Sequence, residues 1–487
     1  MNLLKRIPDR PAANWLIMLV MATAIMMLLS RDSYLYLLGP RCDSAWFFMC
    51  GKAWMNGMVP YVDFADSKGP LLWLIYGVGY LLSHYDYHGV FWVSVVVYSG
   101  TFYFLFKTAR IFVEHRSQAI LAVLMTSVVI FNPITHDETR AEDFGMFFTA
   151  LSLWQLCRML YVEHTERDER TAFFSFGISL AGTLLIKYNI TAMCCIFPAI
   201  GLYYLLRERH PVWRPLLACA AGFAALALPF LIYFLIQGNF SAFIQEYFIN
   251  TLQTIENKDK SAPIIRLKND VMVLILNYRL TALVLLQIAF VAFFSRKGRK
   301  PMFIIALSFF TIICIVSRGY YYYYYLCSLF VVCGFCDISQ LIANRKVGRI
   351  SIVALVCAYY AVMVYRESHH PWWGGNKFME LQINEVENLI SRIENPRVLN
   401  LAVERGYGIK SNILPATRYW SRQIGQTKEM LRMSQMDINN SDVVTTDNWA
   451  SDSVETRKYV LANGFRLVYR FQTTPSPNDY VNIYMRK

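Results

Sequence analysis

Residues 61–72 read Tyr-Val-Asp-Phe-Ala-Asp-Ser-Lys-Gly-Pro-Leu-Leu. They lead into the apolar run Pro70–Ser83, which decides the topology of the chain across the membrane. The run has about 14 residues, too few for an ordinary membrane span. If it crossed the membrane, the later basic clusters, among them Arg296–Lys300, would lie outside. If it lies on the outer surface or dips into it, these clusters lie inside, as the positive-inside rule requires. We therefore expect a surface helix here.

The composition is typical of a polytopic membrane protein. Of the 487 residues, 56% are hydrophobic and only 17% are charged. The formal charge of +13 could suggest nucleic-acid binding, but the basic residues occur in short loops between apolar runs. The sequence contains no P-loop, which argues against ATP-driven transport, and no motif that would support a zinc site.

We expect about eleven spans by length and hydropathy. The basic residues before the first run place the N-terminus in the cytoplasm, and an odd number of spans then places the C-terminus outside. The first external loop would be 31–89. The expected spans are 14–30, 90–110, 118–134, 144–162, 171–187, 190–206, 215–237, 272–294, 301–317, 320–341 and 349–365.

The predicted fold class is a polytopic α-helical membrane protein with juxtamembrane helices in the first external loop and a small C-terminal external α/β domain. The predicted domains are 1–367, transmembrane and catalytic, and 368–487, external. Helical spacing of apolar residues marks Asn376–Glu394, and Ser453–Asn463 reads as a helix closed by Gly464. Strand-like runs follow one another at Arg397–Val403, Asp442–Thr446, Phe465–Phe471 and Tyr480–Met485.

The first external loop begins with a candidate catalytic carboxylate. Asp43 would start a helix whose apolar face, including Trp46, Phe47 and Cys50, lies on the membrane. A carboxylate is favoured at a helix N-terminus, so a plain capping role is the alternative.

The same loop ends with Asp63, Asp66 and Lys68 before Gly69-Pro70. A lysine at the membrane surface is a good ligand for phosphate. A structural salt bridge from Lys68 to Asp63 or Asp66 is the alternative.

Further candidates lie at other external ends of the spans. Arg140, Glu142 and Asp143 belong to an acidic turn, where the two carboxylates could complete a site with Asp43 or cap the next span. Lys187 either binds phosphate or reaches to the surface. Arg318 is followed by six tyrosines beginning at Tyr320, which suit an aromatic belt or a sugar.

Together these residues suit a sugar linked to a lipid phosphate. A carboxylate can take the proton of an acceptor hydroxyl, and cations can stabilise the departing phosphate.

At these motifs the chain resembles the GT-C glycosyltransferases that use polyprenyl-phosphate sugars, within them the protein O-mannosyltransferase and lipid A aminoarabinose transferase group. Asp43 matches that group's early acidic residue, and Asp66-Ser67-Lys68-Gly69-Pro70 matches its Lys-Pro motif with a glycine inserted. Asp143, with Glu142 beside it, matches an Asp at the start of the fourth span. Lys187 matches a Lys-Gly turn, although Tyr188 replaces the glycine. Where the aminoarabinose transferases have a Glu before the lysine, this chain has Ser67, so that Glu's role is not carried over.

The resemblance implies an inverting glycosyltransferase of the inner membrane, with its active site on the external side. Its partners would be a polyprenyl-phosphate-sugar donor, membrane lipid and a glycan, lipid or protein acceptor, with no nucleic acid.

Asp43, Glu142 and Asp143 would be catalytic. No cofactor is implied with certainty, and a divalent metal is left open. An outer-face polysaccharide polymerase or ligase and a lipid-linked-sugar flippase are the alternatives. The residues expected to bind lipid phosphate or sugar are Asp63, Asp66, Lys68, Arg140, Lys187, Arg318 and Tyr320.

Overall fold

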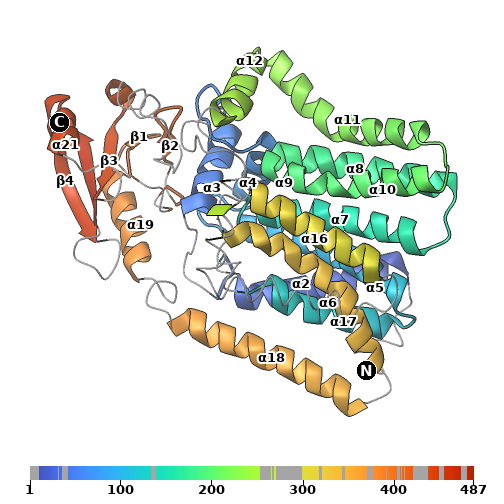
Figure 1. Cartoon of the computed structure of the whole chain (residues 1–487). Coiled ribbons are helices and arrows are strands. Elements are labelled where there is room, and N and C mark those ends of the chain that lie inside the picture. The colour runs from blue at the N-terminus through green and yellow to red at the C-terminus, as the bar shows by residue number, and fades with distance from the viewer. Residues whose placement is uncertain are drawn as a thin grey trace. The chain divides into compact units, whose positions relative to one another are not determined.

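The chain is known from a computed structural model (Figure 1). It describes residues 10–30, 32–35, 42–132, 139–252, 265, 268, 269, 272, 299–316, 321–342, 346–369, 377–390, 392–402, 406, 408–410, 412–420, 437–448, 454–472 and 480–487. The chain divides into two compact units. Unit 1 comprises Met1–Leu29, Ser94–Phe230 and Ser261–Val364, and unit 2 comprises Ser30–Val93, Leu231–Lys260 and Tyr365–Lys487.

Helices occupy every expected span that falls within the described residues, whereas the span expected at 272–294 lies almost wholly outside them. Six of the described helices are long and apolar enough to cross a membrane. The number of eleven spans stays a prediction. The helices are α2 (Pro11–Leu29), α5 (His88–Phe112), α6 (Arg116–Ile130), α7 (Ala141–Tyr161), α8 (Glu166–Ile186), α9 (Tyr188–Cys194), α10 (Ile196–Arg207), α11 (Trp213–Ile236), α16 (Arg299–Val316), η2 (Tyr321–Phe330), α17 (Val331–Leu341) and α18 (Lys346–His369).

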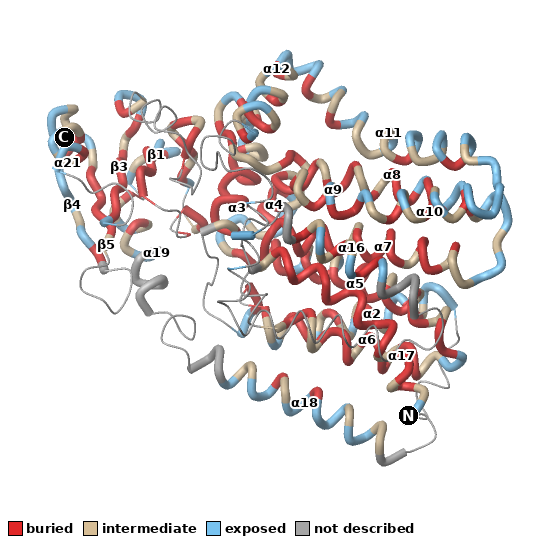
Figure 2. The backbone as a smooth tube through the Cα atoms, viewed as in Figure 1, coloured by how far each residue is buried: buried red, intermediate tan, exposed pale blue. Residues whose placement is uncertain are grey.

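Burial differs sharply between the helices. The spanning window of α5 is 67% buried, whereas the windows of α11 and α18 are only 17% and 11% buried (Figure 2). The exposed side chains of α11 and α18 include many large apolar residues. A soluble protein rarely exposes such surfaces, so these helices are suited to contact with lipid.

A pair of short helices forms the start of unit 2. α3 (Cys42–Met55) packs on α4 (Pro70–Leu82), and the backbones meet so closely that a Cβ at Gly51 would lie 2.4 Å from the nitrogen of Gly77. The predicted helix after Lys68 is present. One expectation about α3 is wrong: Trp46, Phe47 and Cys50 are buried against protein rather than lying on the membrane. Apolar side chains of a helix pack equally well on a neighbouring helix, which the periodicity cannot distinguish from lipid.

The tail contains a five-stranded mixed sheet of order β2-β1-β3-β5-β4. β1 lies parallel to β2 and β3, and β5 is antiparallel to β3 and β4. Leu399, Val444, Val460 and Phe465 belong to its core. Gly464 has a φ of 84° after the second helix, as a left-handed helix end requires. The elements are α19 (Lys377–Ile390), β1 (Arg397–Asn400), β2 (Leu414–Pro415), η3 (Asp437–Asn440), β3 (Val443–Asp447), α21 (Val454–Ala462), β4 (Phe465–Gln472) and β5 (Tyr480–Arg486).

Unit 2 joins this tail to the first loop and to two short helical segments, α12 (Phe240–Phe243) and η1 (Ile244–Asn250). The Lys52 ammonium group, for example, donates to the carbonyl of Gly408 at 3.0 Å. The division into domains 1–367 and 368–487 stays a prediction.

Candidate active site

The first turn of α7 holds two carboxylates inside unit 1. The backbone N–H of Arg140 donates to Oδ2 of Asp143 at 2.7 Å, which caps the helix. The other oxygen of Asp143 accepts from the hydroxyl of Tyr325 at 3.3 Å and from that of Tyr98. Both carboxylates are buried, with Glu142 2% and Asp143 3% exposed. The structure thus supports the capping interpretation of Asp143, and its catalytic role stays a prediction.

Lys187 pairs with Glu142 rather than reaching the surface. Its Nζ lies 2.6 Å from Oε1 of Glu142, and Lys187 is only 8% exposed. The same Nζ lies 4.4 Å from the ring centroid of Tyr323 and 5.1 Å from that of Tyr322. A buried cation is tolerated here because it has both a carboxylate and aromatic faces as partners.

The tyrosine run of η2 organises the cations around α7. The guanidinium carbon of Arg140 lies 4.5 Å from the ring centroid of Tyr322, and the amide of Asn189 donates to the Tyr323 hydroxyl at 3.0 Å. The sequence indicated tyrosines at an external end, but not that their ring faces would hold two predicted site residues. We call this group the α7 cluster: Tyr98, Arg140, Glu142, Asp143, Lys187, Tyr322, Tyr323 and Tyr325.

In unit 2, the loop before α4 is built around an unusual backbone conformation. Tyr61 has a φ of 65°, which is strained for a bulky residue. Its N–H donates to the carbonyl of Phe64 at 2.7 Å, and its hydroxyl donates to the carbonyl of Lys68 at 3.0 Å. Burial raises the pKa of the Tyr61 phenol well above its ordinary value, with Tyr247 and Asp66 adding to the shift. The hydroxyl therefore keeps its proton and keeps Lys68 in place.

Of the two salt bridges that the sequence left open, the structure forms the one to Asp66. The Nζ of Lys68 lies 3.6 Å from Oδ2 of Asp66, and the Lys68 side chain is 12% exposed. The carboxylate of Asp63 instead accepts from the N–H of Val59 at 2.7 Å and closes a turn. Lys68 also lies over Phe47, with its Nζ 5.5 Å from the ring centroid.

Asp43 lies on the same helix as Phe47, the residue whose ring Lys68 covers. It occupies the first turn, four residues before Phe47, so the two share one helix face and are separated by one turn of about 5.4 Å. The hydroxyl of Tyr87 donates to the carbonyl of Ser44 at 3.0 Å and holds the start of the helix. Asp43 is half-buried. We call Asp43, Tyr61, Asp63, Asp66 and Lys68 the α3–α4 cluster.

Sequence reasoning missed a third group, which joins the tail to this loop. Glu246 of η1 accepts from Arg418 at 3.0 Å and from the Tyr419 hydroxyl at 2.9 Å. Arg418 also donates to the carbonyl of Val62 at 2.8 Å, and its own carbonyl accepts from the N–H of Ala65. Burial, followed by Glu246, raises the pKa of Tyr419 to about 12. No local pattern marks these residues, because Glu246 and Arg418 are 172 positions apart.

The predicted residues thus fall into two groups. Asp43, Asp63, Asp66 and Lys68 belong to unit 2, and Arg140, Glu142, Asp143 and Lys187 belong to unit 1. Arg318 and Tyr320 lie outside the described residues.

Comparisons with known proteins agree with this architecture. The family of dolichyl-phosphate-mannose-protein mannosyltransferases matches residues 67–234. The structure of ArnT from Cupriavidus metallidurans bound to undecaprenyl phosphate matches with a TM-score of 0.61 at 9% identity, covering 97% of this chain and 98% of that one. The apo state of ArnT matches with a TM-score of 0.60 at 10% identity over the same shares of the two chains. No curated protein matches the chain in sequence.

The predicted resemblance to the GT-C glycosyltransferases is confirmed. The fold class is confirmed with it: a multi-pass helical membrane protein with a small C-terminal sheet domain. The family match contains Lys68, Glu142, Asp143 and Lys187, but starts after Asp43. The prediction of a membrane glycosyltransferase with a lipid-linked donor agrees with the matched family and with the fold shared with ArnT.

Proposed function

We propose that this glycosyltransferase transfers a sugar from a polyprenyl-phosphate-linked donor to a glycan, lipid or protein acceptor on the outer face of the cytoplasmic membrane. The observation that carries the proposal is the α3–α4 cluster. There Asp43 lies one helical turn along α3 from Phe47, and the mostly buried Lys68 covers the ring of Phe47. ArnT, whose fold the chain shares, was solved with undecaprenyl phosphate, which supports a lipid phosphate as the leaving group.

Asp43 is the proposed general base. It would take the proton of the acceptor hydroxyl while the acceptor oxygen bonds to the anomeric carbon. The bond from that carbon to the phosphate oxygen breaks in the same displacement, which inverts the configuration. Lys68 would stabilise the charge left on the lipid phosphate.

The α7 cluster is proposed to support this reaction rather than to carry it. Both of its carboxylates are already bonded, Glu142 to Lys187 and Asp143 to the start of α7. Glu142 or Asp143 would assist in orienting the acceptor. Lys187 and Arg140, together with Arg318 and Tyr320, would contribute to binding the donor.

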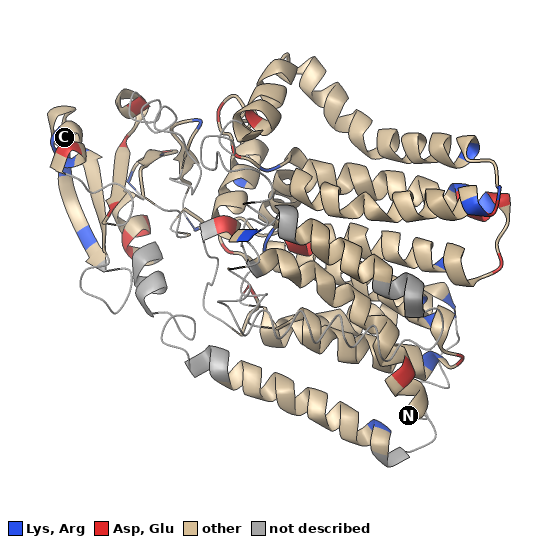
Figure 3. Ribbon diagram, in the orientation of Figure 1, with Lys and Arg blue, Asp and Glu red and all other residues tan. Residues whose placement is uncertain are grey.

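The charge distribution supports the proposed orientation. In unit 1 the charged residues gather where α7 and α10 end and where α8 and α11 begin (Figure 3). Arg158, Arg207 and Arg214 belong to these ends. Basic loops are retained in the cytoplasm, which would leave the other ends of these helices outside.

A transfer assay tests the proposal. Purified protein in liposomes receives a panel of labelled undecaprenyl-phosphate pentoses and hexoses together with envelope lipid acceptors. Asp43→Asn keeps the size and the capping ability of the side chain but removes its basicity. We expect its rate to fall by about 10²–10⁴ while undecaprenyl phosphate still binds.

Two further variants separate the roles. Lys68→Ala is expected to weaken binding of undecaprenyl phosphate, whereas Lys68→Arg keeps the charge and retains most of it. Asp86→Asn is the matched control, because Asp86 belongs to the same expected loop but, among the described residues, bonds to its neighbours Ser83 and His88. Near-normal turnover of Asp43→Asn would reduce Asp43 to a helix cap. Label that crosses the bilayer without joining an acceptor would instead identify a flippase.

A further inference from the structure

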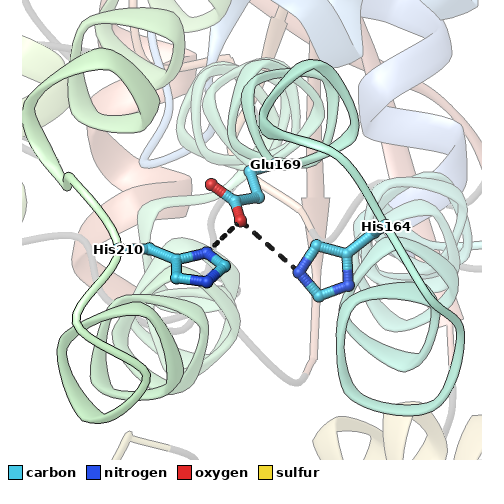
Figure 4. Close-up of side chains that lie close together, drawn as sticks. All are labelled: His164, Glu169 and His210. Atoms are coloured by element: carbon cyan, nitrogen blue, oxygen red, sulfur yellow. Dashed lines mark hydrogen bonds and ion pairs between the residues drawn. The ribbon is translucent and has the colours of Figure 1, made fainter.

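Three side chains of unit 1 converge at the opposite end of α7 from Glu142 and Asp143. His164 lies between α7 and α8, Glu169 in the first turn of α8, and His210 between α10 and α11. One potential ligand atom from each lies within 4.8 Å of the other two. Figure 4 shows the two imidazole rings on either side of the Glu169 carboxylate.

Local structure holds two of these residues in place. The N–H of Glu169 donates to the carbonyl of Thr165, the residue that caps α8, at 3.1 Å. Arg209, two residues after the end of α10, lies in the left-handed region at a φ of 58°. The N–H of His210 donates back to the carbonyl of Leu205 at 2.8 Å, which completes a Schellman-type helix end. The carboxylate and one imidazole are therefore presented by fixed backbone.

The imidazole of His164 has one nitrogen engaged and the other directed at the carboxylate. Its Nδ1 lies 3.0 Å from the carbonyl of Val162, and because a carbonyl only accepts, Nδ1 carries the proton. In the neutral ring Nε2 is then a bare acceptor. It makes no hydrogen bond within the described residues and lies 3.5 Å from Oε1 of Glu169, in a side chain that is 7% exposed. Two buried acceptors facing each other are unfavourable unless a proton or a metal cation lies between them.

We propose that His164 Nε2, Glu169 Oε1 and His210 Nδ1 bind a divalent transition-metal ion of the zinc class. In tetrahedral zinc sites, ligand atoms at about 2.0–2.2 Å from the metal are separated by about 3.3–3.6 Å. The distance from His164 Nε2 to Glu169 Oε1 already has this value. The Nδ1 atom of His210 lies 2.5 Å from Oε1, so metal binding replaces this hydrogen bond and moves the two atoms apart by about 1 Å.

The donor set also determines the class of metal. Two imidazoles and one carboxylate suit zinc and its neighbours, whereas magnesium and calcium prefer oxygen ligands throughout. The bond from Nδ1 of His164 to a backbone carbonyl is the outer interaction that commonly orients a metal-binding histidine.

The surroundings of the site determine from which side the metal enters and which segments it joins. Three protein ligands leave a fourth position for water. The side chain of His210 is 42% exposed, whereas that of Glu169 is 2% exposed, so the metal enters from the His210 side. Because the two histidines come from two loops, the metal ties the α7–α8 loop to the α10–α11 loop. The ion pair of Arg214 with Glu166, at 3.0 Å, joins the starts of the helices that follow these loops, α11 and α8.

Zinc binding by the purified full-length protein tests this site. The protein carries a tag without histidine, and Zn²⁺ is titrated against a chromophoric chelator. We expect wild type to bind one more Zn²⁺ per chain than the double variant His164→Ala/His210→Ala. Loss of an outer-shell partner alone typically costs 10–100-fold in affinity, so Glu169→Gln, which loses a ligand, is expected to bind at least about 100-fold more weakly. X-ray absorption should show only nitrogen and oxygen ligands at about 2.0–2.2 Å.

The controls separate this site from other zinc ligands in the chain. His115→Ala removes an exposed histidine at the start of α6 and should leave the zinc stoichiometry unchanged. Glu169→Gln preserves side-chain size, so it reports on the site even if the double variant fails to fold. Zn²⁺ should raise the melting temperature of wild type but not of Glu169→Gln, and Mg²⁺ should raise neither. Equal zinc stoichiometry and affinity in wild type and Glu169→Gln would overturn the proposal and leave a histidine–carboxylate hydrogen-bond network.

Discussion

The buried ion pair between Glu142 and Lys187 shows how strongly single residues of the α7 cluster depend on one another. Each charge is almost completely removed from solvent, and the two atoms that join them are 2.6 Å apart. Removing one partner of such a pair leaves the other charged and uncompensated, whereas replacing both can be nearly neutral.

We therefore expect Lys187→Met to destabilise the protein by about 3–5 kcal/mol. The double variant Lys187→Met/Glu142→Gln should recover much of this loss, because no charge is then left unpaired. Thermal unfolding of the two single variants and the double variant forms a double-mutant cycle. Additive effects would show that the pair contributes little and that Lys187 acts independently of Glu142.

A second residue-scale prediction concerns the strained Tyr61. Tyr61→Phe removes only the hydroxyl that donates to the carbonyl of Lys68. The expected loss of stability is about 1 kcal/mol, with weaker binding of undecaprenyl phosphate because Lys68 is less restrained. Tyr85→Phe, at an exposed position, is the control. Unchanged melting and unchanged lipid binding in Tyr61→Phe would contradict a positioning role for the hydroxyl.

At the scale of elements, glycines allow helix backbones to meet where side chains would separate them. A Cβ at Gly177 of α8 would lie 1.9 Å from the carbonyl oxygen of Cys219 in α11. A Cβ at Gly222 would lie 2.0 Å from the carbonyl oxygen of Phe174. Small residues at such contacts are characteristic of helix pairs in membranes.

We expect Gly177→Ala to destabilise unit 1 by about 2–3 kcal/mol, because the obstacle is backbone and cannot rotate away. Gly201→Ala is the matched control in α10, since its new methyl would meet only the ring edges of Phe176 and Phe173 at 3.3 Å or more. Thermal unfolding in detergent measures both variants. A Gly177→Ala variant as stable as Gly201→Ala would show that α8 and α11 can move apart without loss.

At the scale of the whole molecule, the order of elements along the chain differs from their grouping in space. Unit 2 collects residues from the first loop, the α12–η1 region and the tail. Within it, the Arg418 contacts with Glu246 and Val62 bind the tail to the loop that carries Lys68. The tail is thus placed to restrain the α3–α4 cluster.

Topology is the whole-molecule prediction, because every basic cluster can lie inside only if the C-terminus lies outside. A reporter fused after Lys487 should behave as external, and one inserted at Gly298 should behave as cytoplasmic. A cytoplasmic signal from the fusion after Lys487 would mean that the number of spans is even and that the predicted topology is wrong.

The sequence by itself determined the elements whose causes are local. Apolar runs predicted helices in ten of the eleven expected spans. Gly464 predicted the end of α21, and strand-like runs predicted β1, β3, β4 and β5. Short motifs also marked Asp43, Lys68 and Asp143, since capping and turn chemistry act over only a few residues.

Only the tertiary structure decided which partners these residues take. Lys187 could equally have reached the surface, Lys68 could have paired with Asp63, and the apolar face of α3 could have lain on lipid. His164, Glu169 and His210 carry no recognisable metal motif, and Glu246 finds Arg418 across 172 positions. These contacts depend on packing between distant segments, and local propensity carries no information about which segments meet.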